Sequence, residues 1–334
     1  MIIISEGEFM RKKKESETST PYDDAFRTLM NDCIKLLIPV INEIFGKNYT
    51  GDEKIIQHQN EHFINQQDGK SDKRVTDSSF SIIDSEGNET FFIIEAQSTP
   101  DNTMIIRIFE YATQVALDAS TLENNKLTVT IPHASVIFLR SNSNTPDEMI
   151  IEMITPGGNV SFTVPVLKVK TYSLSDIFEK ELYFLLPFYI FNMEKDFPLY
   201  DTDSEKLETL ETEYNKFIAG IDEAVSKGKI SVYYRRVILD MSKKVLENIA
   251  KKYENVQKGV NKIMGGRVLE HEGKTIFNEG RNEGRNEGIA IGEARGREKT
   301  NNAINAAIDF MRLNGMSVAQ INDFRNSVLN SLSN

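Results

Sequence analysis

Two short runs of β-forming residues joined by a turn constrain the fold of this chain more than any other feature. Residues 74–84 (RVTDSSFSIID) and 90–97 (TFFIIEAQ) are rich in β-branched and aromatic side chains. The intervening residues 85–87 (SEG) end on glycine, which adopts a positive φ angle without steric cost. The pattern predicts a β-hairpin.

The turn also determines which residues face each other across this hairpin. If Asp84 pairs with Asn88 across a three-residue loop, with Gly87 at the positive-φ position, the numbers of opposed residues always total 172. Asp77 then lies directly opposite Glu95. Opposed residues have Cβ atoms roughly 4.5–5.5 Å apart, and two carboxylates at that distance destabilise the sheet unless a cation neutralises them. Asp77 and Glu95 are therefore a candidate site for a bridging divalent metal ion.

The strand over 90–97 is expected to have one apolar face and one face that carries chemistry. Since side chains alternate along a strand, Glu95 and Gln97 share a face, and the opposite face is filled by Phe92, Ile94 and Ala96. Glu95 follows the apolar run 91–94, which is typical of a buried strand, and a buried carboxylate needs a partner. The alternative is a solvated strand face, which often carries scattered acidic residues.

The order of motifs resembles the PD-(D/E)XK nuclease core, and in particular its transposase-like branch, the recombination-promoting nucleases. An aspartate, a hairpin and then Glu95-Ala96-Gln97 stand where many relatives have Glu-x-Lys. The resemblance extends over residues 21 to about 330. It rests on these further segments, in order: PYDDAFRTLM (21–30), RVTD (74–77), Arg107-x-x-x-Tyr111, ELYFLLPFYI (181–190) and EGRNEGRNEG (279–288).

The resemblance implies a fold, an activity and a set of site residues. The fold is α/β, a restriction-endonuclease-like core in which helices flank a mixed β-sheet. The activity is that of a Mg²⁺-dependent DNA endonuclease, for which Mn²⁺ could substitute. Such an enzyme would promote recombination or derive from a transposase. Asp77, Glu95 and the Ala96 carbonyl would bind the metal, and in some such nucleases an acid on the first helix, here Glu43, also reaches it. The competing interpretation is a catalytically decayed binding or assembly module.

Gln97 departs from the wider superfamily, which has lysine at this position. A glutamine side chain carries no charge and takes no proton at pH 7. Its catalytic role would therefore be to orient a water molecule or the scissile phosphate.

Charge argues for only weak binding to DNA. The net charge is −11, whereas phosphate binding usually draws on an excess of Lys and Arg. Basic residues nevertheless cluster beside the proposed site, where they precede the first hairpin strand, follow the second and lie on a later strand, and a solvated surface explains them about as well. We expect salt-sensitive, sequence-nonspecific binding. The residues of this basic rim are Lys70, Lys73, Arg74, Arg107, Lys168 and Lys170.

A helix is expected after the hairpin, beginning at Thr99-Pro100. Arg107, Tyr111 and Gln114 fall on one face of it, which could meet a phosphate. Equally, Arg107 could pair with a core carboxylate while Tyr111 packs under the sheet.

The 334 residues leave room for about two domains. Residues 1–20 are polar and predicted to be disordered, and a helix is expected to begin with Thr20 as its N-cap and to kink at Pro39. Further strands are predicted at 126–131, 134–140, 148–154 and 161–170. The predicted domains are a nuclease-like domain (21–195), a helical extension (196–264), a glycine-spaced segment (265–300) and a C-terminal helical unit (301–334).

The glycine-spaced segment repeats every four residues over 280–296. Five interior glycines would cost an isolated helix about 5 kcal/mol relative to alanine. Two copies could pair along the glycine ridge and form a homo-oligomer, or the segment could be a flexible linker. The glycines are Gly280, Gly284, Gly288, Gly292 and Gly296.

Other features bound the location and cofactors of the protein. A single cysteine, Cys33, excludes an intramolecular disulfide and is expected in the core. Apolar runs such as 183–191 are shorter than the ~20 residues of a membrane span, so we expect a cytoplasmic protein without a membrane partner. His58 and His62 lack the further ligands of a zinc site.

Overall fold

The computed structural model describes residues 21–58, 61–65, 71–75, 78–98 and 103–265, together with Ala307, Ile308, Met311 and Met316. The chain divides into two compact units, Met1–Ile276 and Phe277–Asn334. Several predictions fall outside the described residues: the disordered N-terminus, the Thr20 cap, the repeat at 280–296 and most of the C-terminal helical unit. The helix that was predicted to begin at Thr99-Pro100 begins instead at Met104, with Thr103 at its N-cap position.

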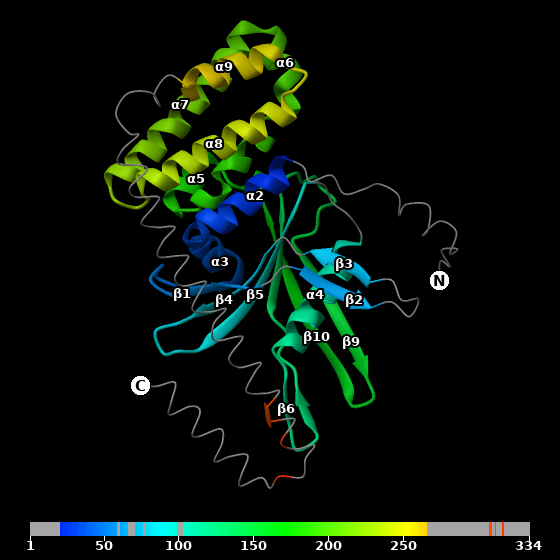
Figure 1. The fold of residues 1–334 in the computed structure, drawn as a ribbon. Helices are drawn as coiled ribbons and strands as arrows, with labels where there is room; N and C mark the ends of the chain where they lie inside the picture. The colour runs from blue at the N-terminus through cyan, green and yellow to red at the C-terminus, as the bar shows by residue number, and fades with distance from the viewer. Residues whose placement is uncertain are drawn as a thin grey trace, which may run out of the picture. The chain divides into compact units, whose positions relative to one another are not determined.

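The first unit is built on a six-stranded mixed sheet (Figure 1). The first three strands pair antiparallel, and the third, fourth and fifth are parallel. In spatial order they are β1 (Lys54–Gln57), β4 (Ser78–Ile83), β5 (Glu89–Gln97), β8 (His133–Phe138), β10 (Gly158–Lys168) and β9 (Glu148–Thr155). Two smaller sheets pair β2 (Glu61–Asn65) with β3 (Ser71–Val75), and β6 (Thr121–Glu123) with β7 (Lys126–Thr128).

Helices pack on this sheet and extend beyond it, as the fold prediction required. The α-helices are α2 (Pro21–Asp32), α3 (Ile38–Phe45), α4 (Met104–Asp118), α5 (Leu174–Glu179), α6 (Phe197–Thr202), α7 (Ser204–Ser226), α8 (Val232–Ile249) and α9 (Glu254–Gly265). The 3₁₀ segments are η1 (Ile34–Leu37), η2 (Val169–Thr171), η3 (Tyr183–Asn192) and η4 (Glu194–Asp196). None of the described helices is both long and apolar enough to cross a membrane.

The predicted hairpin register is confirmed. Every Cα pair of β4 and β5, from Ser78 with Ile94 to Ile83 with Glu89, has residue numbers that total 172. The Asp84 N–H donates to the Asn88 carbonyl at 3.1 Å, and Gly87 has a φ of 84°. Local turn chemistry and the alternation of apolar residues were therefore sufficient to set the register.

The extent of the first hairpin strand was predicted wrongly. Residues 74–84 are not one strand, because β3 pairs with β2 in a separate sheet and β4 begins at Ser78. The physical difference is burial, since Ser78, Ser79 and Phe80 are all buried in the large sheet, whereas the sequence of β3, SDKRV, is mostly polar. Asp77 lies between these strands, outside the described residues.

The first helix also differs from its prediction. It is not one helix kinked at Pro39, because α2 ends at Asp32, η1 intervenes, and Pro39 lies in the first turn of α3. Proline is well tolerated there since it needs no backbone donor at that position. Cys33, at the break, is fully buried, which confirms its predicted core position.

The two faces of the sheet contact different apolar clusters. The face toward α4 packs against that helix in the smaller cluster, which includes Ile93, Ile108 and Val136. The other face belongs to a larger cluster that includes residues of α2, α3, η3, α7, α8 and α9. Helices α7, α8 and α9 gather at one end of the sheet (Figure 1).

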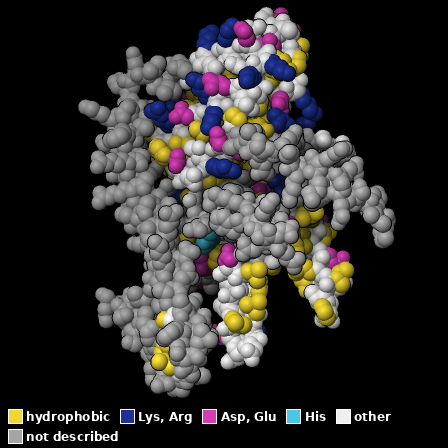
Figure 2. All heavy atoms as spheres, turned by 45° about the vertical axis from the view of Figure 1, so that its right-hand side comes forward, with side chains coloured by type: hydrophobic (Ala, Val, Ile, Leu, Met, Phe, Trp, Pro, Cys, Tyr) yellow, Lys and Arg dark blue, Asp and Glu magenta, His cyan; other side chains and the backbone are white. Residues whose placement is uncertain are grey.

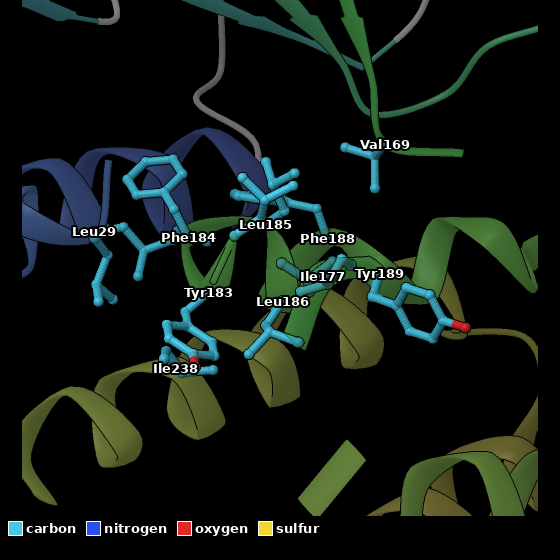
Figure 3. Close-up of a cluster of buried hydrophobic side chains, with 14 of the residues drawn as sticks. Leu29, Val169, Ile177, Tyr183, Phe184, Leu185, Leu186, Phe188, Tyr189 and Ile238 are labelled. Carbon is cyan, nitrogen blue, oxygen red and sulfur yellow. The ribbon is translucent and has the colours of Figure 1, made fainter. Parts of the chain in front are cut away.

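The segment η3 is central to the larger cluster. Its residues Tyr183–Phe191 are all buried. Phe184 lies toward α2, whereas Tyr183 and Leu186 lie toward α8 (Figure 3). Phe184 packs edge-on against Phe26 of α2, with ring centroids 5.3 Å apart. The predicted nuclease-like domain and helical extension therefore share one core.

We expect Gly220→Ala to destabilise the first unit despite the better helix propensity of alanine. Gly220 lies in α7, where an added Cβ would come within 2.4 Å of the Phe178 ring. Overpacking of this kind costs about 1–3 kcal/mol, against a propensity gain of about 1 kcal/mol. Thermal unfolding of Gly220→Ala should show a lower Tm than that of Thr212→Ala, an exposed control on the same helix. An equal or higher Tm would contradict the packing argument.

Candidate active site and metal centre

Glu95 lies near the carboxyl end of the buried strand β5. The side chains of Phe92, Ile93 and Ile94 before it are completely inaccessible, and Glu95 itself is 4% exposed. Among the side chains that the structure describes, it is the only acidic one that is buried. The prediction of a carboxylate near the end of a buried strand is confirmed.

The two faces of β5 alternate as predicted, but their polarity differs from the prediction. Phe92, Ile94 and Ala96 face the large cluster, while Ile93 lies in the cluster under α4 with Phe91 packed against it. The face shared by Glu95 and Gln97 is therefore mainly apolar and covered by a helix. Its polar side chains are concentrated toward the carboxyl end of the strand, where a site could form.

Arg107 reaches this end of β5 from α4. Its Nη2 donates to Gln97 Oε1 at 3.3 Å and lies 3.8 Å from the sulfur of Met104. Arg107 is part of the inward stripe of α4, between the fully buried Met104 and Ile108. The structure thus brings together Gln97 and Arg107, which sequence reasoning had assigned to separate roles.

Tyr111 and Gln114 do not form a phosphate-binding face with Arg107. Tyr111 is 6% exposed and packs in the cluster under α4, as in the alternative interpretation. Gln114 instead donates to Asp118 Oδ1 at 2.9 Å. Since Tyr111 is enclosed by apolar side chains, we do not retain it as a nucleic-acid contact.

Glu43 lies on α3, whose buried residues face the large cluster and not the cluster beneath α4. It accepts a hydrogen bond from Tyr172 Oη at 3.0 Å and pairs with Lys180. Burial, followed by the neighbouring Glu43 carboxylate, raises the pKa of Tyr172 above its usual value. These contacts give Glu43 a structural role between α3 and α5, so we leave it out of the proposed metal site.

The predicted basic rim is only partly described. Lys70 lies outside the described residues. Lys73 and Arg74 of β3 pair with Phe63 and His62 of β2, and the side chains of Lys73 and Arg74 are not described. The Lys168 ammonium donates to Asp147 at 2.7 Å. Lys170 lies beside Lys195, which lowers the pKa of Lys170. On the face seen in Figure 2, acidic and basic side chains are interspersed over the helical part.

Sequence reasoning missed a polar cluster at the start of the hairpin. The buried Ser81 hydroxyl donates to Glu89 Oε1 at 2.6 Å and lies 3.0 Å from His58 Nε2. Because a hydroxyl has one proton, Ser81 accepts from His58, whose Nε2 must therefore carry hydrogen. The alternation of serines with apolar residues along β4 was the only signal in the sequence, and it did not specify these partners.

No group of three His, Cys, Asp or Glu side chains suited to a metal ion occurs within the described ranges. The predicted pair of carboxylates requires Asp77, which lies outside them. The oxygen donors that are described, the Glu95 carboxylate and the Ala96 carbonyl, are of the type that Mg²⁺ prefers.

Residues 20–181 match the model of a protein family described as "Putative transposase, YhgA-like". The match contains the hairpin, Glu95, Gln97 and Arg107, and it supports a transposase-like family for this chain. It ends before η3, whereas the resemblance noted in the sequence extended to about residue 330. Neither the curated proteins nor the solved structures gave a match.

Proposed function

We propose that this protein is a metal-dependent DNA endonuclease of the PD-(D/E)XK type, with its active site at the carboxyl end of β5. The observation that carries the proposal is the buried Glu95, two residues before Gln97 on a strand whose partner follows the predicted register. The transposase-like family match supports a DNA-processing function.

The proposed metal site consists of Asp77, Glu95 and the Ala96 carbonyl. Asp77 lies outside the described residues, and the register predicted from the turn, which β4 and β5 follow from Ser78 to Ile83, would place it opposite Glu95. Two carboxylates and a carbonyl supply hard oxygen ligands for Mg²⁺, with Mn²⁺ as a substitute. A bound Mg²⁺ would lower the pKa of water and stabilise negative charge on the phosphate.

The chain's own residues have three proposed roles. Glu95 and Asp77 bind the metal, and their mutual repulsion is relieved when it binds. Gln97 holds the water or the scissile phosphate by hydrogen bonds, since it cannot act as a base. The apolar cluster under α4 limits access of bulk water to that side of the site, so that charges there are less screened.

Purified protein incubated with supercoiled plasmid tests the proposal directly. We expect nicking with Mg²⁺ or Mn²⁺, and none with EDTA. Absence of nicking with either metal, while the protein still binds plasmid, would favour the alternative of a decayed nuclease-fold binding module.

We also propose that the DNA contact is weak and nonspecific. The net charge of −11 and the interspersed surface charges support few phosphate contacts. Raising salt from about 50 to about 200 mM should sharply weaken binding to plasmid and to unrelated linear duplexes alike. A preference for one duplex that survives the higher salt would contradict this proposal.

The glycine-spaced segment 280–296 is proposed as a pairing element between two copies of the chain. Removing residues 266–334 should then lower the particle mass by more than the removed segment accounts for, as measured by light scattering. A particle that keeps the same number of copies would support the linker interpretation.

A further inference from the structure

We propose that Arg107 is a positioning residue for Gln97, and that the pair together replaces the lysine of the wider superfamily. Arg107 would hold the amide of Gln97 in one orientation and supply the positive charge that glutamine lacks. This inference rests on the proposed function, because it assigns Gln97 to the reaction.

The hydrogen bond between the two side chains fixes the orientation of the amide. A guanidinium group can only donate, and its Nη2 lies 3.3 Å from the Gln97 oxygen. If the amide were turned over, its NH₂ group would face the guanidinium, donor against donor. The carbonyl oxygen of Gln97 is therefore held toward Arg107, and the amide nitrogen, with two hydrogens, is directed away from it.

That orientation makes Gln97 a hydrogen-bond donor, as a lysine would be. A negatively charged phosphate oxygen or the oxygen of a water molecule could accept from the amide nitrogen. The guanidinium withdraws electron density through the carbonyl oxygen, which strengthens donation from the nitrogen. The amide thus transmits part of the charge of Arg107 toward the proposed site.

The packing of α4 keeps Arg107 in place. It occupies the inward stripe of the helix beside the fully buried Met104 and Ile108, and Tyr111 follows one turn later at 6% exposure. An arginine that served only as a flexible phosphate contact would be expected on the outer face, where Ile106 is 58% exposed. Partial burial also reduces the screening of its charge.

This arrangement gives a physical reason for glutamine at position 97. A lysine there would place its ammonium group close to the Arg107 guanidinium, and two like charges in a half-buried site repel strongly. Glutamine offers an oxygen to the arginine and an N–H donor to the site. Among the described residues, the cation beside position 97 is therefore located on α4 and not on β5.

A double-mutant cycle distinguishes this role from direct contact with DNA. Arg107→Met should be introduced into three backgrounds: the parent, Gln97→Leu and Gln97→Lys. Nicking by each protein is then measured in single turnovers at saturating Mg²⁺. We expect the substitution to slow the parent about 10- to 100-fold, which is less than the loss of the positioned donor itself would cause. In the Gln97→Leu background it should change the nicking rate by less than about twofold. The amide that Arg107 positions is already absent there, so the two substitutions are not independent. Arg107→Met should accelerate Gln97→Lys by removing the repulsion.

Two further variants complete the cycle. Arg107→Lys keeps a donor and should retain part of the rate, whereas Arg236→Met removes an exposed arginine of α8 and should have no effect. Equal slowing by Arg107→Met in all three backgrounds would mean that Arg107 contacts the substrate itself, and it would overturn the inference.

A second measurement does not depend on activity. Side-chain amide signals of the full chain labelled with ¹⁵N-glutamine can be recorded by NMR, and the Gln97 pair identified by its loss in Gln97→Leu. We expect Arg107→Met to shift this pair and Arg236→Met to leave it unchanged. If the parent does not nick plasmid but the pair shifts, the proposed reaction fails while the contact stands. An unchanged pair in Arg107→Met overturns the positioning role whatever the activity.

Discussion

Replacing Glu95 with glutamine should reduce metal-stimulated nicking by about a thousandfold or more. Glutamine has nearly the same shape but lacks the negative charge that would hold the metal, and metal-dependent stabilisation of transition-state charge is worth several kcal/mol. Asp77→Asn should have an effect of similar size. Nicking is measured on supercoiled plasmid across a range of Mg²⁺ concentrations, with Mg²⁺ binding measured separately by calorimetry.

The matched control for this prediction is Glu152→Gln, which removes an exposed carboxylate of strand β9. It should keep the activity and the metal affinity of the parent. Glu95→Gln should fold as the parent does, because glutamine has nearly the same shape as glutamate. Full activity in Glu95→Gln would refute the assignment of the metal site.

Replacing Gln97 with leucine should slow single-turnover nicking by roughly 10- to 1,000-fold while metal affinity changes little. Leucine occupies a similar volume but removes both hydrogen-bonding groups, and the loss of one positioned donor has an effect on this scale. The rate at saturating Mg²⁺ reports the chemistry, and calorimetric titration with Mg²⁺ reports the affinity.

The geometry changes what we expect of lysine at this position. From the sequence, Gln97→Lys should retain more activity than Gln97→Leu, because lysine restores a donor. Beside Arg107, however, the new charge is repelled, so the benefit should appear mainly when Arg107→Met accompanies it. A leucine variant as fast as the parent would reduce Gln97 to a neighbour of the chemistry.

Local chemistry was enough to predict the hairpin and the burial of Glu95. The positive φ of Gly87 and the pairing of Asp84 with Asn88 depend on residues close in sequence, so the register followed from them. The apolar run before Glu95 predicted a buried strand for the same reason.

Tertiary packing determined the features that join distant segments. The polar β3 pairs with β2, η3 unites the predicted domain and extension in one core, and Glu43 pairs with Lys180. The same holds for Arg107, whose helical position predicted only its face and not the contact with Gln97. Short-range turn geometry and alternation leave their mark on the sequence, whereas the partner of a long polar side chain depends on which elements the core brings together.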